Sequence, residues 1–367
     1  MATITLPRAR ARLIDETALL RLTLGGLLIW QIGLYVDVWN HIHFGFQIET
    51  FITWAHAILY GGWAISSVPA LLYLVESRRM GERATLPTAY GMVLLGIGLY
   101  GTGGVFDSIW HTLFGFEARH DAALSPSHLW LAAAFTITAF GLLQAAVRQA
   151  RIGADRLAPL GVAFVLESLL LVAHWSISYG QPMLTDFADG GAAVRNLPGY
   201  AGLAWTNVAA QVAGTTGLLL YSALLVAIVT FGLYRLRLGT GAISVMIIGE
   251  AAVIVPAGDQ WSFLPSAVLG ALVGELLWSS ARRGAWGGPD AALPYAILAA
   301  TIPLVQLTTY LLVLNVFGGG VIWSAHLFAG VPVAAAIIDV VVAMLIAPPE
   351  FLRLSVVPGS DRPPGHW

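Results

Sequence analysis

The chain has 367 residues, of which 57% are hydrophobic and only 10% are charged, and its mean hydropathy is +0.77. Soluble domains carry about 25% charged residues, so this composition predicts a polytopic membrane protein. The net charge of −2 gives no basic surface for nucleic acid. Because the chain contains no cysteine, disulfides, iron–sulfur clusters, thiolate metal sites and covalently attached haem are excluded.

Apolar runs follow one another along the chain, and a run of roughly 20 residues is long enough to cross a bilayer as a helix. We therefore expect an all-α fold, a polytopic transmembrane bundle of about ten spans. The first run continues beyond the apolar core of a signal peptide, so we expect it to remain as a membrane helix. The expected spans are 18–38, 51–75, 89–110, 127–147, 157–179, 211–234, 240–257, 264–280, 293–315 and 322–346.

Two stretches leave alternatives open. The seventh and eighth spans are short, and an alternative for residues 255–265 between them is a re-entrant turn. The run over 200–235 is long enough to begin with a helix that lies along the membrane surface. The predicted organisation is an N-terminal segment (1–17), a four-span half (18–147), a six-span half (148–346) and a C-terminal tail (347–367).

The arginines divide unequally between the two faces that this span count defines. Sixteen lie on the face that carries both termini, and only Arg119 and Arg195 lie on the other. Arginine and lysine mark the cytoplasmic side, so both termini are predicted to be cytoplasmic. The lysine-free composition, rich in Ala, Gly, Leu and Val, is typical of a GC-rich bacterial genome, which predicts the bacterial inner membrane. The expected partners are the lipid bilayer and, as open alternatives, other membrane subunits or further copies of this chain.

Eight of the nine histidines fall on the opposite, outer face. There the pattern D-x-x-x-H-x-x-F-G-F occurs twice, with Asp37 and His41 in one copy and Asp107 and His111 in the other. Asp and His at i and i+4 lie on one helix face, about 5–6 Å apart at Cβ. Such a pair can bind one metal ion, or the carboxylate can orient the imidazole by accepting its second ring proton.

A further histidine opens the apolar run after each copy of the pattern. Thr53 and Ser125 occupy N-cap positions ahead of His56 and His128. A histidine near the positive end of a helix resists protonation, so it stays neutral, as a metal ligand must be. The alternative is that these histidines belong to the aromatic belt at the membrane interface. The candidate metal ligands are Asp37, His41, His56, Asp107, His111, His128, His174 and His326.

Histidine and carboxylate ligands without sulfur favour Cu(II), zinc or non-haem iron over Cu(I). Copper is the expected cofactor, and zinc, non-haem iron and haem b are alternatives. Carboxylates also lie inside the predicted spans, where an ionisable group is costly and is therefore a candidate for function. Glu167, Glu250 and Asp339 are expected to form an ion or proton path, unless each is protonated or bonded to a neighbouring helix.

The D-x-x-x-H pattern with a later histidine resembles the C subunit of the copper membrane monooxygenases, the particulate methane and ammonia oxygenases. In that family an Asp and two His of this arrangement bind copper near the outer face. The resemblance implies that Asp107, His111 and His128, or in the other copy Asp37, His41 and His56, bind copper. The duplication and the ten-span count differ from that family.

Together these features predict an integral membrane metalloprotein with an outward-facing His/Asp site. The leading hypothesis for its chemistry is oxidation of a small or lipid-soluble substrate by a copper- or iron-dependent oxidoreductase. A metal or proton-coupled transporter is an alternative that uses the outer histidines and the buried carboxylates. A b-type haem protein with His56 and His128 or His174 as axial ligands, and a purely structural role for the histidines, are further alternatives.

Overall fold

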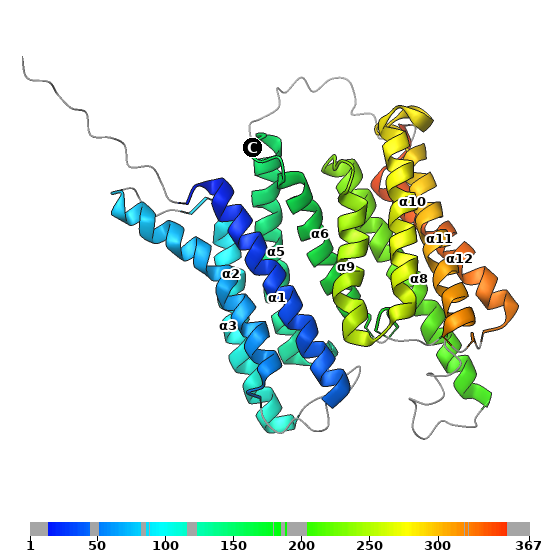
Figure 1. Ribbon diagram of the computed structural model, residues 1–367, viewed down its shortest axis with the longest axis horizontal. Coiled ribbons are helices and arrows are strands. Elements are labelled where there is room, and N and C mark those ends of the chain that lie inside the picture. Colours follow the sequence, from blue (N-terminus) through cyan, green and yellow to red (C-terminus); the bar gives the residue numbers. More distant parts are fainter. Residues whose placement is uncertain are drawn as a thin grey trace, which may run out of the picture.

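A bundle of long helices makes up the part of the chain that the structure describes (Figure 1). The structure is a computed structural model and describes residues 14–44, 51–81, 86–87, 89–115, 123–178, 180–184, 188, 204–318, 320–321 and 323–350, with the backbone alone at 204–207 and 209–210. Arg119, Arg195, residues 1–13 and the tail beyond 350 lie outside these ranges. The helices are α1 (Glu16–Phe44), α2 (Trp54–Arg79), α3 (Ala89–Phe114), α5 (Pro126–Arg151), α6 (Ala158–Trp175), α8 (Ala204–Arg235), α9 (Ala242–Gly258), α10 (Leu264–Arg282), α11 (Leu293–Phe317) and α12 (Ala325–Ile346).

The expected all-α membrane bundle is confirmed. Within the described ranges, nine helices are long and apolar enough to cross a membrane, and α9 is a shorter apolar helix. The stretch 255–265 contains the end of α9, a short 3-10 turn at Trp261–Phe263 and the start of α10. Because α9 and α10 run side by side in opposite directions (Figure 1), this stretch is the tight turn of a helical hairpin. The expected surface segment before residue 211 is instead continuous with the span, since α8 begins at Ala204.

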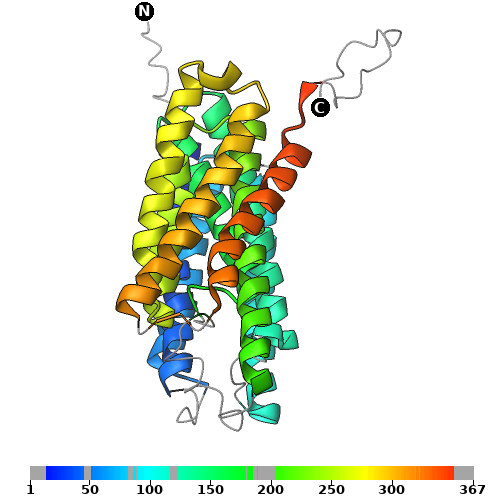
Figure 2. The same ribbon diagram turned by 90° about the vertical axis from the view of Figure 1, so that its right-hand side faces the viewer.

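The two ends of the bundle differ in charge. Helix α1 begins at the upper end in Figure 1, and α12 ends at the upper end in Figure 2. Since successive helices alternate in direction, every arginine among the described residues lies toward this end. Here the Arg21 guanidinium donates to both carboxylate oxygens of Asp155, at 2.8 and 2.7 Å, and holds the pKa of Asp155 down at about 2. The described histidines lie toward the opposite end, which we call the histidine end.

Two helical hairpins, α1–α2 and α3–α5, carry the two copies of the Asp/His pattern, and small residues bring the helices of each hairpin together. A Cβ atom on Gly26 would lie 2.5 Å from Cα of Ser66. The same close approach joins Gly96 to Thr138, 70 and 72 residues further along. The duplication seen in the ten-residue pattern therefore extends through both helices of each hairpin.

Aromatic contacts relate the two hairpins by an approximate two-fold axis. Trp30 of α1 packs edge-on against Phe135 of α5, with ring centroids 4.9 Å apart. The equivalent residues of the other copies, Tyr100 of α3 and Trp63 of α2, stack with centroids 6.4 Å apart. Trp30 and Tyr100, which are equivalent to each other, meet at 4.5 Å. A contact between equivalent residues places the axis beside this pair, and the two Asp/His clusters consequently lie at the same end of the bundle.

The Gly26 contact gives a prediction about stability. Gly26→Ala should lower the free energy of unfolding by about 1–3 kcal/mol, because the new methyl group meets the backbone of Ser66 rather than a movable side chain. Gly25→Ala is the matched control, since a Cβ there meets nothing within 4 Å and alanine favours the helix by up to about 1 kcal/mol. The measurement is a denaturant titration in detergent micelles. Equal effects of the two substitutions would contradict close packing of α1 on α2.

Candidate metal centre

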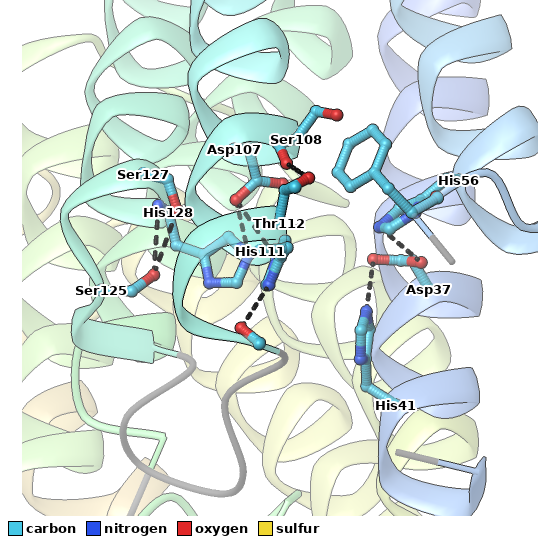
Figure 3. Close-up of polar contacts among 12 residues, drawn as sticks. Asp37, His41, His56, Asp107, Ser108, His111, Thr112, Ser125, Ser127 and His128 are labelled. Atoms are coloured by element: carbon cyan, nitrogen blue, oxygen red, sulfur yellow. Dashed lines mark hydrogen bonds and ion pairs between the residues drawn. The ribbon is translucent and has the colours of Figure 1, made fainter. Parts of the chain in front are cut away.

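The structure brings six of the eight predicted ligands together in two groups of three (Figure 3). We call Asp37, His41 and His56 the first centre, and Asp107, His111 and His128 the second centre. In each centre, one ligand atom from each residue lies within 4.8 Å of the other two. Each centre therefore offers two imidazole nitrogens and one carboxylate oxygen to a single ion.

Local helix geometry explains the assembly of the second centre. Asp107 and His111 stand one turn apart near the end of α3, while His128 stands in the first turn of α5. The Ser125 hydroxyl is the N-cap of α5 and accepts a hydrogen bond from the backbone N–H of His128. Helix α5 packs against α3, which sets His128 opposite Asp107. Thr53 caps α2 in the same way in the first centre.

Each carboxylate faces two imidazole Nε2 atoms. In the first centre, Asp37 Oδ2 lies 3.6 Å from His41 Nε2, and Asp37 Oδ1 lies 3.4 Å from His56 Nε2. In the second centre, Asp107 Oδ1 lies 3.4 Å from Nε2 of both His111 and His128. These separations exceed the usual N–H···O range of about 2.7–3.2 Å. They match the edge of a tetrahedron around an ion, which is about 3.4 Å for ligands at about 2.1 Å.

In each centre, one histidine has a backbone carbonyl beside its Nδ1 atom, which shows that this nitrogen is protonated. His56 Nδ1 hydrogen-bonds to the carbonyl of Phe51, and His111 Nδ1 lies 3.2 Å from the carbonyl oxygen of Gly115. A carbonyl only accepts, so Nδ1 carries a proton, and when the ring is neutral its Nε2 lone pair points at the carboxylate. Two lone pairs facing each other require a cation between them, either a proton or a metal ion. A backbone carbonyl behind the ring is also the usual support of a histidine that binds a metal.

Each centre contains both buried and partly exposed side chains. Asp107 and His111 are buried, with only 2% of each side chain exposed, while His128 exposes 20%. In the first centre His41 exposes 21%, and His56 is covered by Phe51, whose ring stacks on the imidazole with centroids 4.5 Å apart. Each centre thus has one histidine at the surface of the histidine end, where an external ligand can approach.

The two centres are neighbours. The Phe51 ring that covers His56 also lies 6.1 Å, centroid to centroid, from the ring of His111 in the second centre. His41 lies within electrostatic reach of His111 and His128, and His56 lies within reach of Asp107. Figure 3 shows the labelled side chains of the two centres facing one another from the two hairpins.

The other two predicted ligands lie elsewhere. His326 is exposed in the first turn of α12, after the N-cap Ser324, and belongs to neither centre. His174 is fully buried near the end of α6, where its Nδ1 makes a short hydrogen bond with the carboxylate of Glu250 on α9. Its Nε2 lies 3.1 Å from the carbonyl oxygen of Tyr221 on α8. Both ring nitrogens of His174 are therefore engaged within the bundle.

The predicted carboxylate path corresponds to three buried carboxyl groups on three helices. Glu167 accepts a hydrogen bond from the Gln31 side chain at 3.1 Å, and its side chain lies against Gly249, the neighbour of Glu250. Asp339 is buried on α12 beside Ser222 of α8. Glu167 and Glu250 are each bonded to a side chain on another helix, whereas neither carboxyl oxygen of Asp339 has a hydrogen-bond partner among the residues that the structure describes.

Sequence patterns missed several of these partners. His43 at the end of α1 hydrogen-bonds through Nε2 to Asp259 at 2.7 Å and through Nδ1 to the carbonyl of Trp39 at 2.8 Å. Asp259 is 216 residues away in the sequence, so no local spacing predicts this pair. The pairing of His174 with Glu250 was missed for the same reason.

Comparison with known proteins adds no family assignment, since no family model, no curated protein and no solved structure matches this chain. Conclusions about function consequently depend on the geometry of the two centres and of the buried polar groups.

Proposed function

We propose that this chain is a membrane metalloprotein that holds two metal ions, one in each His/Asp centre. The observation that carries the proposal is the same in both copies: an imidazole whose Nδ1–H is committed to a carbonyl aims its Nε2 at a carboxylate oxygen 3.4 Å away. One divalent ion satisfies the carboxylate and both imidazoles at once. A proton can join the carboxylate to only one imidazole.

The donor set and the number of ligands are compatible with a redox-active metal. Two imidazoles and one carboxylate suit Cu(II), zinc and non-haem iron, and the two-histidine, one-carboxylate set is that of many non-haem iron oxygenases. Three protein ligands leave further coordination positions for a substrate or oxidant. We propose copper- or iron-dependent oxidation of a small or lipid-soluble substrate, with copper as the first choice.

The chain's own residues would have separate tasks in this chemistry. The Asp carboxylates and the Nε2 atoms hold the ion, while the carbonyls of Phe51 and Gly115 fix the orientation of His56 and His111. The stacked ring of Phe51 shields the first centre from water on one side. The arginine-rich end supports a cytoplasmic location for both termini and hence an outward-facing metal site. The lysine-free composition is the basis for proposing the inner membrane of a bacterium.

Metal stoichiometry tests the proposal. We expect the purified chain, loaded with Cu²⁺ and dialysed, to retain two ions, and His56→Ala and His128→Ala each to retain one. His326→Ala is the matched control, because His326 also follows a serine N-cap in a first turn but is part of no three-ligand group among the described residues. It should retain two ions. Elemental analysis gives the count, and electron paramagnetic resonance reports whether ascorbate reduces the bound copper.

One outcome would contradict metal binding, and another would contradict only the oxidoreductase activity. Wild-type protein that retains no copper, zinc or iron would overturn the metal centres themselves. Retention of zinc alone, or of copper that cannot be reduced, would overturn the oxidoreductase while leaving the metal sites. A Soret band would favour haem, although His174 has no ring nitrogen left for haem iron.

A second candidate, proton-coupled transport, is favoured by the His174–Glu250 pair. Because His174 Nε2–H donates to the Tyr221 carbonyl, one further proton is shared between Nδ1 and the Glu250 carboxylate. The pair is fully buried in the bundle, close to Glu167. A shared proton inside a membrane is the element that a proton path requires.

A further inference from the structure

Tyr60 carries a buried hydroxyl group that finds no hydrogen-bond partner among the residues that the structure describes. Tyr60 stands one turn after His56 on α2, and the centroids of the two rings are 6.1 Å apart. A buried phenol oxygen without a partner costs free energy, so such groups normally bond to protein, water or a ligand. A ligand bound beside Tyr60 would satisfy this hydroxyl group.

Gly104 of α3 makes room for this hydroxyl group. A Cβ atom on residue 104 would lie 2.7 Å from Cε1 and 2.9 Å from the hydroxyl oxygen of Tyr60. The equivalent positions in the other copies are Leu34 and Ala132. The phenol is thus present in the first hairpin alone, and the glycine that admits it is present in the second hairpin alone. Tyr60 and Gly104 therefore both break the approximate two-fold symmetry, and together they place one hydroxyl group between α2 and α3.

The charges around Tyr60 favour an anion as the ligand. Both Asp37 and Asp107 lie within electrostatic reach of the phenol group. A divalent ion bound by one carboxylate and two neutral imidazoles carries a net charge of about +1, so the two loaded centres together would carry about +2 within electrostatic reach of Tyr60. A small anion bound at such a centre would reduce this charge, and within reach of Tyr60 it would accept a hydrogen bond from the hydroxyl group.

We propose that Tyr60 is a positioning residue that donates a hydrogen bond to a small anionic ligand bound at the metal centres. The inference rests on the proposed metal-binding function. It adds the class of the external ligand, a small anion or an oxygen donor with anionic character, and the residue that orients it.

Azide binding to the full-length, Cu²⁺-loaded protein in detergent tests this role. Tyr60→Phe removes only the hydroxyl group, so we expect two ions to remain bound and the azide affinity, followed by visible absorption, to fall about tenfold or more. Tyr73→Phe, the same change toward the other end of α2, should leave both quantities at their wild-type values. Gly104→Ala should weaken azide binding by displacing the Tyr60 ring, and should add little in a Tyr60→Phe background.

The outcomes separate this inference from the function on which it rests. Wild-type azide affinity in Tyr60→Phe, with two ions still bound, would overturn the role of Tyr60 and leave the metal centres in place. Absence of bound metal from both the wild-type protein and the variant would overturn both proposals. Loss of metal from Tyr60→Phe alone would show that Tyr60 supports the centres and would contradict its role in anion binding.

Discussion

The double variant Asp37→Asn, Asp107→Asn should lose tight binding of both metal ions, with each single variant losing one. Each carboxylate is the group that faces both histidines of its centre, at 3.4–3.6 Å. An amide keeps the size of the carboxylate but removes the negative charge. Replacing groups that merely support a ligand already costs 10–100-fold in metal affinity, so loss of the charged ligand should cost about 100-fold or more at the altered centre.

Asp259→Asn is the control for this experiment. Asp259 is an acidic residue at the same end of the bundle and also faces a histidine, His43, at 2.7 Å. Among the residues that the structure describes, Asp259 has one histidine partner, so the control should retain two ions. Equilibrium dialysis against Cu²⁺ or Zn²⁺ gives the affinities. If the double variant bound both ions as tightly as the wild-type protein, the two centres would not be the metal sites.

Proton release distinguishes the two cations that can lie between the carboxylate and the imidazoles. A metal ion that replaces protons must release them on binding. In weak buffer, we expect Cu²⁺ to release protons from the wild-type protein and to release few from the double variant. This measurement also shows whether the empty centres hold imidazolium–carboxylate pairs.

Breaking the His174–Glu250 pair is the second large effect that we expect. His174→Leu or Glu250→Leu alone should lower the free energy of unfolding by about 3–5 kcal/mol, because either change leaves a polar partner buried and uncompensated. The double variant should be more stable than either single variant, since a buried pair is often replaced by apolar residues at little cost. A denaturant titration in detergent micelles gives the free energies for this cycle.

An exposed ion pair provides the comparison for this cycle. Arg237 and Asp290 lie 2.8 Å apart with 57% and 83% of their side chains exposed, so Asp290→Asn should change the free energy of unfolding by less than about 1 kcal/mol. Additive losses in the His174 and Glu250 variants would contradict direct coupling of the buried pair.

The same variants test proton-coupled transport. Wild-type vesicles should show proton flux under a pH gradient if the buried carboxyl groups carry protons, and the variant with leucine at 174 and 250 should show none. Equal flux in the two preparations would overturn transport through this pair, whatever its contribution to stability.

Hydropathy and helix periodicity predicted much of this molecule because they act locally. An apolar run must be helical in a membrane, where each backbone polar group needs a partner within the segment. The one-turn spacing of Asp107 and His111 and the N-cap at Ser125 fix the neighbourhood of the second centre within a single hairpin. Both centres could therefore be predicted from patterns within about twenty residues of sequence.

Contacts between hairpins could not be predicted in this way. The partner of His174 lies 76 residues away, and the match of Tyr60 with Gly104 depends on how α2 and α3 are aligned along their axes. His326 shows the opposite case: it follows the Ser324 N-cap in a first turn, as His128 follows Ser125, but among the described residues it belongs to no group of three possible metal ligands. Local resemblance alone thus predicted one ligand that the packing of the helices does not place in a centre.

Trp30 and Tyr100 are equivalent residues of two hairpins that belong to one chain, so the two proposed metal centres need not be identical. Two separate hairpins of identical sequence would be obliged to carry the same residue at every related position. Joined in one chain, the halves are free to diverge, and here one half supplies Phe51 and Tyr60 where the other has Ala123 and Ala132. The two ligand sets therefore lie in unlike surroundings, so if both centres bind copper, the two ions should give two distinguishable spectra and accept electrons at different potentials.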